Sequence, residues 1–481
     1  MLVGKSFDDV EDQLRQAARG ADPIFSMVGT VWSVVSPADF WGHVKPYIAR
    51  SDLEALERAL QNVLGAVDPA LELPPDERWL AGMRGMARVH SRELRRGLAI
   101  TLALIGTKGE SSTLGGASTG GAWVRRVLHG LFRRANADES GQLWASLTDV
   151  LPLLAEAAPD VFLSALDTAI AHPGTLLSQM FTDSQSDALT TASPHGGLLW
   201  ALEVTAWLPA HFGQSAIALA ALSEVDPGGR LSNRPLGSLK AIFRPWLPQT
   251  LAGFTDRLAS LSALVERYPD TGPRLLIELL PSSHDLATPN AKPEFRAEVP
   301  DLERADPREW VETITALVSQ LLLLMRGQGE LWPSFLAHLG DLPQADRDRV
   351  YAELPVSIAA IQPDERTALW EVATDLIRRH REYQDARRAL PEDELVRFET
   401  AIADAAPTDP RDAARWLFDE THPDIGVRKA ELAAYDAEID KLRVDALRRI
   451  LNEYGMSGIK DFAQSVTYPS LVGWTLAGVG E

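Results

Sequence analysis

Residues 195–250 read HGGLLWALEVTAWLPAHFGQSAIALAALSEVDPGGRLSNRPLGSLKAIFRPWLPQT, and they decide how the fold is interpreted. Two apolar segments at helical spacing come first, a loop with glycine and proline follows, and a short helix then ends at a proline-containing corner. Trp200 and Trp207 are seven residues apart and share one helical stripe, a pattern that is more typical of a core than of a ligand site. We therefore predict two core helices with buried tryptophans, followed by a tightly specified loop.

The same helical periodicity runs through most of the 481 residues, and alternating strand patterns are nearly absent. Most helical segments are about 10 to 18 residues long, and the turns between them often contain proline. No strict sequence repeat is visible. The sequence therefore predicts an all-α protein, an irregular α-solenoid of stacked antiparallel helix pairs, with two or three separate helical bundles as the alternative.

The longest stretch without a clear period is residues 281–306, which contains four prolines. A long segment without periodicity marks a boundary or a packed irregular loop. We therefore predict an N-terminal helical array over residues 1–280, an irregular connecting segment over 281–306 and a C-terminal helical array over 307–481.

A second irregular stretch, residues 106–121, reads GTKGESSTLGGASTGG and is rich in Gly, Ser and Thr. A glycine-rich turn before a helix can hold phosphate on its backbone N–H groups. A phosphate-binding P-loop, however, needs Lys-Ser/Thr directly after its glycines and a strand before them, and here Lys108 lies upstream. We predict a flexible linker between two helices.

The composition excludes several classes of chemistry. There is no cysteine, so disulfides, cysteine-based zinc sites, iron–sulfur clusters and a thiol nucleophile are excluded. Lys and Arg number 47 against 67 Asp and Glu, a net charge of −20 that argues against unspecific nucleic-acid binding. The N-terminus has no apolar signal core, and the longest apolar run, residues 318–325, is far short of the roughly 20 residues of a membrane span. We expect a cytoplasmic protein with no membrane partner and no cofactor.

One segment departs from this acidic balance. Residues 84–134 contain ten Lys or Arg and only two Glu. The candidate binding residues in it, chosen because several share helix faces, are Arg88, Arg92, Arg95, Arg126 and Arg133. These arginines could dock an acidic partner or, less in keeping with the overall charge, a nucleic-acid backbone. The alternative is a solvated face whose arginines pair with acidic helices of the same protein.

The loop DPGGRLSNRP, residues 226–235, is the most specific feature of the opening stretch. Its Asp-Pro-Gly-Gly start has strong turn chemistry. Arg230 and Arg234, with Asn233 between them, could clamp a carboxylate or a phosphate. The alternative is that the arginines hold the loop in place by pairing with carbonyl groups or with nearby glutamates.

Metal and carboxylate chemistry has weaker support. His284 and Asp285 form a His-Asp pair of the kind found in metal-dependent phosphohydrolases, but no second ligand pair at metal-binding spacing is visible. A turn is the simpler interpretation of that pair. Glu371 and Asp375 lie on an arginine-rich helix and are interpreted as surface charge pairing rather than as a catalytic carboxylate pair.

Several segments together resemble a helical region of large bacterial proteins. The segments are LPPDERW (73–79), HSRELRRGLAITLALIG (90–106), LLWALE (198–203), DPGGRLSNRP (226–235), SLKAIF (238–243), LLPSSHDLATP (279–289) and AARWLFDE (413–420). In those proteins the helical region is joined to a Sir2-like or nuclease effector and often to a STAND-type NTPase, and many belong to antiphage defence. No effector or nucleotide-binding motif is present in this sequence, so no catalytic residue is carried over.

The resemblance implies a non-enzymatic helical sensor or scaffold. Its expected partner is a protein, either an NTPase or effector subunit or a phage protein, and nucleic acid is an unlikely ligand. Two other classes remain as alternatives: a metal-dependent hydrolase that uses the loop of His284 and Asp285, and a nucleic-acid-binding protein that uses residues 84–134.

Overall fold

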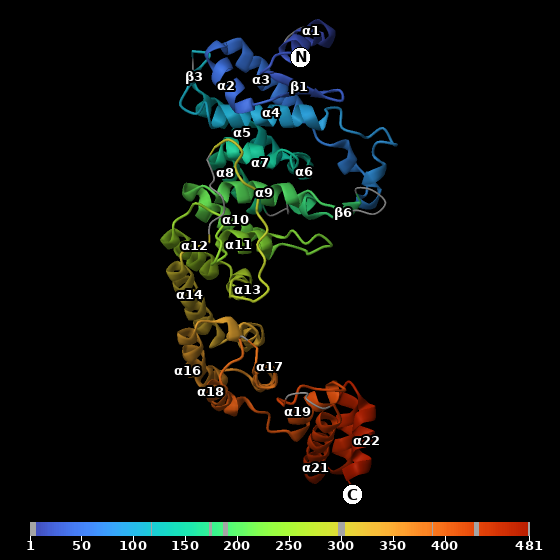
Figure 1. The fold of residues 1–481 in the computed structure, drawn as a ribbon. Helices are drawn as coiled ribbons and strands as arrows, with labels where there is room; N and C mark the ends of the chain where they lie inside the picture. Colours follow the sequence, from blue (N-terminus) through green and yellow to red (C-terminus); the bar gives the residue numbers. More distant parts are fainter. Residues whose placement is uncertain are drawn as a thin grey trace. The chain divides into compact units, whose positions relative to one another are not determined.

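The computed structural model describes residues 6–116, 118–172, 176–185, 191–296, 304–386, 388–427 and 432–479. The described residues form an all-α fold, as predicted from the periodicity (Figure 1). Their β structure consists of three two-stranded antiparallel hairpins. No helix within these ranges is long and apolar enough to cross a membrane.

The chain divides into two compact units, each described here by itself. The first unit comprises residues 1–275 and 287–306, and the second comprises residues 276–286 and 307–481. The segment 281–306, predicted as a connection, is thus shared: its first six residues belong to the second unit and the remainder to the first.

The elements of the first unit follow in chain order. Its α-helices are α1 (Phe7–Ala17), α2 (Pro37–Val44), α3 (Arg50–Val63), α4 (Arg92–Gly106), α5 (Gly120–Ala137), α6 (Gln142–Ser146), α7 (Leu151–Ala157), α8 (Pro159–Ile170), α9 (His195–Ala206), α10 (Phe212–Glu224), α11 (Pro235–Phe243) and α12 (Phe254–Arg267), and α13 (Thr271–Glu278) begins in it. Its strands are β1 (Phe25–Val28), β2 (Val31–Val34), β3 (Thr113–Leu114), β4 (Ser118–Thr119), β5 (Ser184–Gln185) and β6 (Thr191–Ala192).

Two rows of helices stack in series through this unit (Figure 1). One row is α4, α7 and α9; the other is α5, α8, α10 and α12. Each of α4, α7 and α9 also contacts the helix that follows it in the chain, which belongs to the other row. A helix covered on several sides must be apolar nearly all round, and α9 accordingly buries every residue except Gly196 and Trp200. Serial stacking of this kind is the arrangement that the solenoid prediction describes.

The two tryptophans of the opening stretch have different surroundings. Trp207 is 2% exposed, whereas Trp200 is 52% exposed. Trp207 follows the last residue of α9, and its Nε1 donates to Asn290 Oδ1 and to the carbonyl oxygen of Ala291, both at 3.0 Å. The prediction that both tryptophans are core residues is therefore wrong for Trp200. The periodicity of an apolar helix does not show which side a distant segment covers.

Two segments of the first unit differ from their predicted form. Residues 25–34 form the β1–β2 hairpin, which the sequence analysis did not predict. Residues 106–121 contain the β3–β4 hairpin and close backbone packing in place of a free linker. A Cβ atom on Gly106 would lie 2.2 Å from the carbonyl oxygen of Ala157, and one on Gly120 would lie 2.4 Å from that of Gly109. These glycines permit a close backbone approach.

The second unit is also helical. Its α-helices are α14 (Pro307–Met325), α15 (Trp332–Leu336), α16 (Gln344–Ala360), α17 (Pro363–Glu382), α18 (Glu392–Ile402), α19 (Pro410–Ala414), α20 (Trp416–Asp419), α21 (Leu432–Ser465) and α22 (Pro469–Val479). The pairs α14–α16, α16–α18 and α17–α18 are in contact, and α19 and α22 both pack on α21. Phe418 and Phe462 lie edge to face at 5.3 Å in the core between α20, α21 and α22.

Candidate functional site

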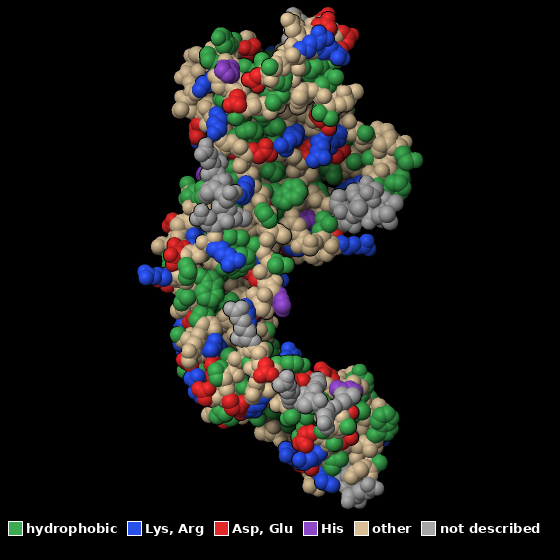
Figure 2. Space-filling model, in the orientation of Figure 1, with side chains coloured by type: hydrophobic (Ala, Val, Ile, Leu, Met, Phe, Trp, Pro, Cys, Tyr) green, Lys and Arg blue, Asp and Glu red, His purple; other side chains and the backbone are tan. Residues whose placement is uncertain are grey.

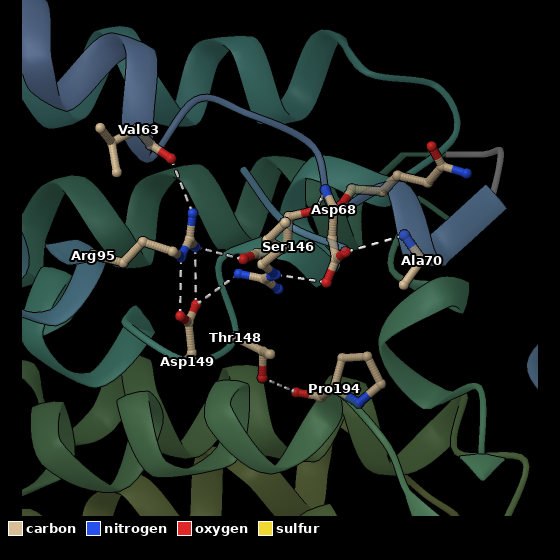
Figure 3. Close-up of polar contacts among 10 residues, drawn as sticks. Val63, Asp68, Ala70, Arg95, Ser146, Thr148, Asp149 and Pro194 are labelled. Carbon is tan, nitrogen blue, oxygen red and sulfur yellow. Dashed lines mark hydrogen bonds and ion pairs between the residues drawn. The ribbon is translucent and has the colours of Figure 1, made fainter. Parts of the chain in front are cut away.

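Arg95, one of the predicted binding residues, lies at the centre of a buried polar network in the first unit (Figure 3). Its side chain is 2% exposed, and its guanidinium donates to both carboxylate oxygens of Asp149 at 2.9 Å. It also donates to the carbonyl oxygens of Val63 at 3.0 Å and Ser146 at 2.7 Å. All of these partners come from the same unit, so Arg95 fixes α3, α4 and the turn before α7 together and is not accessible to a partner.

Arg88 belongs to the same network. Its Nε donates to Asp68 at 2.6 Å, and a terminal nitrogen of its guanidinium lies 3.5 Å from Asp149. Burial opposes the ionisation of Asp149, but the hydrogen bonds and charge of Arg95, and then the charge of Arg88, outweigh it and hold the pKa of Asp149 below its usual value. Two of the five candidate arginines of residues 84–134 are therefore structural.

Four of the eight other cations of residues 84–134 also have acidic partners in the first unit. The ion pairs are Arg84–Glu77, Arg96–Glu294, Arg125–Glu110, Arg125–Asp160 and Arg126–Glu57. The last of these is bidentate, at 2.7 and 2.8 Å. Figure 2 shows acidic and basic side chains interspersed over the visible face of this unit. The geometry favours the interpretation of a solvated face with internal partners, and leaves Arg92 and Arg133 as exposed candidates.

The loop at residues 226–234 is held by its own acidic residue. Arg234 donates from Nε to Asp226 Oδ2 at 2.9 Å, pairs a second time with the same carboxylate, and lies 5.7 Å from the centre of the Phe181 ring. The backbone N–H of Arg230 donates to Asp183 Oδ2 at 3.0 Å, while the Arg230 side chain is exposed. Arg234 thus stabilises the loop, through Asp226 rather than through the glutamates suggested by the sequence.

Asn233 is held through its main chain by a buried histidine. His195 is fully buried, and its Nε2 donates to the carbonyl oxygen of Asn233 at 2.7 Å. Its Nδ1 lies 2.6 Å from Ser193 Oγ, and its ring stacks on Phe181 at 5.5 Å. Burial, and then the nearby charge of Arg234, lower the pKa of His195 below its usual value.

This histidine makes the first unit sensitive to acid. His195 binds a proton at higher pH in the unfolded protein than in the folded protein. The free energy of unfolding should therefore fall as pH decreases through about 6.5. We expect the free energy of unfolding of the wild type to decrease between about pH 7 and pH 5 more than that of His195→Gln, measured by urea unfolding. His129→Gln, at an exposed position on α5, should behave as the wild type. An equal pH dependence of all three chains would contradict the assignment.

The His284–Asp285 pair lies in an exposed turn of the second unit. His284 is exposed, and the N–H of Asp285 donates to the carbonyl oxygen of Ser282 at 3.2 Å. Over the described ranges, no group of three or more His, Cys, Asp or Glu side chains could hold a metal ion. The geometry of this pair is that of a turn, and the metal-dependent hydrolase gains no support from it.

The second unit carries a concave site that the sequence analysis did not identify. It is a cleft of about 660 Å³ between α17 and α20, bordered by the end of α15. The lining residues are Leu336, Ala337, Glu371, Val372, Asp375, Leu376, Arg378, Arg379, Arg415, Trp416, Asp419, Glu420, Pro423 and Asp424. Five of them are acidic and three are basic, so the formal charge of the lining is 3 − 5 = −2.

Helical spacing brings the charged residues of α17 to the cleft. Glu371, Asp375 and Arg378 are separated by four and three residues and so share one face. Asp375 pairs with Arg379 at 2.5 Å and lies 3.8 Å from Arg378. Burial raises the pKa of Glu371; the charge of Arg415 opposes this shift and that of Asp419 adds to it. The interpretation of surface charge pairing thus fits Asp375 but not Glu371.

The opposite wall presents an aromatic ring. The guanidinium carbon of Arg378 lies 3.6 Å from the centre of the Trp416 ring, a cation–π contact. Burial lowers the pKa of Arg378, and the nearby carboxylates of Asp375 and Asp424 oppose that shift. The Nε atom of Arg378 is buried and has no hydrogen-bond acceptor within the described part of the chain. The cleft therefore already holds one guanidinium between an aromatic face and carboxylates.

Comparisons with known proteins give no further guide to this site. No protein-family model matches the chain, and no curated protein matches it. Among solved structures, the chain is similar to an engineered protein from the Northeast Structural Genomics Consortium, with 11% sequence identity, 91% of this chain and 98% of that chain covered, and a TM-score of 0.22. A likeness at this TM-score supports no inference about fold or function.

Proposed function

We propose that this protein is a non-enzymatic helical scaffold that binds a protein partner, and that the cleft of the second unit receives a basic segment of that partner. The observation that carries the proposal is the acidic lining of the cleft around the ring of Trp416. Opposite charges across an interface steer association and fix the register of the partner. A Lys or Arg side chain of the partner is the group that this lining complements.

The internal contact of Arg378 supports an arginine as the preferred cation. An arginine stacks on an aromatic face and donates to carboxylates from its planar edge, which a lysine does not reproduce. Arg378 stacks on the ring of Trp416 and lies within ion-pair distance of Asp375, at 3.8 Å. A second guanidinium from a partner would find the carboxylates of Glu371 and Glu420 in the same cleft.

The resemblance to helical regions of antiphage proteins suggests what the partner is. We propose an NTPase or effector subunit, or a phage protein, whose basic segment the cleft recognises. Tagged protein from infected and uninfected cells should copurify with such a partner, and the amount recovered should fall when Glu371 and Glu420 are both changed to Gln. Equal recovery with the unchanged and changed clefts would place the binding surface elsewhere.

The charge complementarity can be tested with a defined probe. We expect a fluorescent nonapeptide of alternating Arg and Ser to bind the full chain, and Glu371→Gln to weaken binding about threefold, on the order of 0.7 kcal/mol for one partly exposed charge pair. Affinity should fall as salt rises, because exposed charges are screened. Glu330→Gln, an exposed change outside the cleft, is the matched control and should leave binding unchanged. Equal weakening by both substitutions would mean unspecific attraction to an acidic protein.

A further inference from the structure

The first unit contains an irregular segment held mainly through its main chain. We call residues 288–296 the strap; they form no helix or strand. The strap packs on α7 and α9, where it meets four buried or largely buried polar side chains: those of Glu156, Glu203, Trp207 and Gln249. Each of these side chains donates to or accepts from the strap, and almost all of their contacts are with its backbone.

Glu156 on α7 makes the most concentrated contact. Its side chain is 1% exposed and accepts three consecutive backbone N–H groups, those of Glu294, Phe295 and Arg296, at 2.9, 2.5 and 2.5 Å. A buried carboxylate is costly unless its oxygens are hydrogen-bonded. The geometry of this residue is therefore matched to a main chain that offers three amides in succession.

Three other side chains contact the first half of the strap. Glu203 accepts the N–H of Ala291 at 2.9 Å. The side-chain amide of Gln249 makes two hydrogen bonds to the strap. Its oxygen accepts the N–H of Asn290 at 2.7 Å, and its nitrogen donates to the carbonyl oxygen of Thr288 at 2.9 Å. Trp207 donates to the carbonyl oxygen of Ala291. These contacts depend on the strap backbone, whereas the side chains of Asn290 and Lys292 add one contact each, both with Trp207.

Few side chains of the strap are fully buried. Thr288, Pro289 and Glu294 are exposed, and only Pro293 is buried. A segment with few buried apolar side chains opens at lower free energy than a core helix. The strap is thus held mainly by polar contacts that another peptide in the same backbone conformation could reproduce.

One strap side chain, Arg296, is recognised specifically. Its guanidinium and Nε donate to the carbonyl oxygens of Gly106, Glu156 and Ala157, at 2.9, 2.9 and 3.2 Å, and one nitrogen lies 3.2 Å from Glu110. Gly106 and Ala157 are the last residues of α4 and α7, where carbonyl groups lack helical partners and the helix dipole favours a cation. The ends of the two helices form an arginine pocket.

We propose that this surface of the first unit is a binding site for a peptide that carries an arginine and adopts the irregular backbone conformation of the strap, and that the strap is a resident occupant that such a peptide displaces. The ligand class follows from the contacts: consecutive free amides for Glu156, a peptide group for Gln249 and a guanidinium for the ends of α4 and α7. The site is separate from the cleft of the second unit, and its test does not depend on the cleft.

Hydrogen exchange of the wild-type protein tests whether the strap opens on its own. We expect the amides of residues 294–296 to exchange at least tenfold faster than that of Leu202 in α9, under conditions where exchange reports opening equilibria. Exchange of both sets at the rate of global unfolding would overturn the proposal, because a strap that opens only with the whole unit is not displaceable.

A peptide in trans tests the binding site itself. The probe is the acetylated and amidated peptide ATPNAKPEFR, the sequence of residues 287–296. We expect it to bind the Arg296→Leu chain at least tenfold more tightly than the wild type, whose own arginine occupies the pocket. The same peptide with leucine in place of its arginine should bind the Arg296→Leu chain at least tenfold more weakly.

One further chain controls for general loosening. Arg96→Leu removes a surface ion pair to the side chain of Glu294 and leaves the arginine pocket intact, so it should bind the peptide as the wild type does. Circular dichroism establishes that each chain is folded. Absence of peptide binding to a folded Arg296→Leu chain, or equal binding to all the chains, would overturn the proposal.

Discussion

Replacing Arg95 by alanine is expected to lower the free energy of unfolding by about 3–5 kcal/mol, the usual cost of removing one partner of a buried ion pair. The substitution leaves Asp149 without its bidentate donor and leaves the carbonyl oxygens of Val63 and Ser146 without theirs. Because these groups come from α3, from the end of α6 and from the turn before α7, the loss should loosen the contact of these segments with α4.

Urea unfolding followed by tryptophan fluorescence measures this loss. Arg92→Ala is the matched control, since Arg92 lies in the first turn of the same helix and is exposed. It should change the free energy of unfolding by no more than about 0.5 kcal/mol. A loss of less than 1 kcal/mol for Arg95→Ala would show that its network does not stabilise the unit.

The second large effect is expected from Gly197→Ala, which should destabilise the first unit by about 1–3 kcal/mol or more. A Cβ atom on Gly197 in α9 would lie 2.0 Å from the carbonyl oxygen of Thr148 and 2.4 Å from its hydroxyl. The hydroxyl is itself fixed, because it donates to the carbonyl oxygen of Pro194 at 2.5 Å (Figure 3). The backbones therefore have to move apart to admit a methyl group.

The neighbouring glycine provides the control for that experiment. A Cβ atom on Gly196 would meet nothing closer than the side-chain amide of Asn233, at 3.9 Å. Gly196→Ala should be neutral or stabilise the protein by up to about 1 kcal/mol, because alanine favours a helix. In thermal unfolding, Gly197→Ala should lower the Tm, whereas Gly196→Ala should leave the Tm unchanged or raise it. Similar Tm shifts of the two variants would contradict the close packing of α9.

The all-α fold could be predicted because helical periodicity depends on local spacing, as in α4 and α12. The β1–β2 hairpin could not, because its strands are only four residues long and none of their residues is buried, so they carry no alternation of core and surface residues. The glycines of residues 106–121 were interpreted as a flexible linker for a related reason. Their composition is the same in a loose loop and in a close approach to Ala157.

Less of the candidate site than of the fold could be predicted from the sequence. Sequence spacing predicts shared helix faces for Arg88, Arg92 and Arg95, but Arg88 lies outside any helix, before the start of α4. The roles of Arg88 and Arg95 depend on Asp68 and Asp149, which the fold brings in from other segments. Trp416 lies within the segment AARWLFDE, yet its contact with Arg378 joins two helices that the sequence does not pair. The one available signal was Glu371, a carboxylate without a cation at helical spacing on α17 to match it.

The central claim is that the cleft binds a basic segment of a protein partner, and site-specific photocrosslinking in cells tests it most directly. A photoreactive amino acid replaces Val372 in the cleft or, as the control, the exposed Val356 on α16. The account predicts that position 372 crosslinks one defined protein through a segment rich in Lys or Arg, and that Glu371→Lys in the same chain abolishes the product. Crosslinking equal to that at position 356, or unaffected by Glu371→Lys, would contradict it.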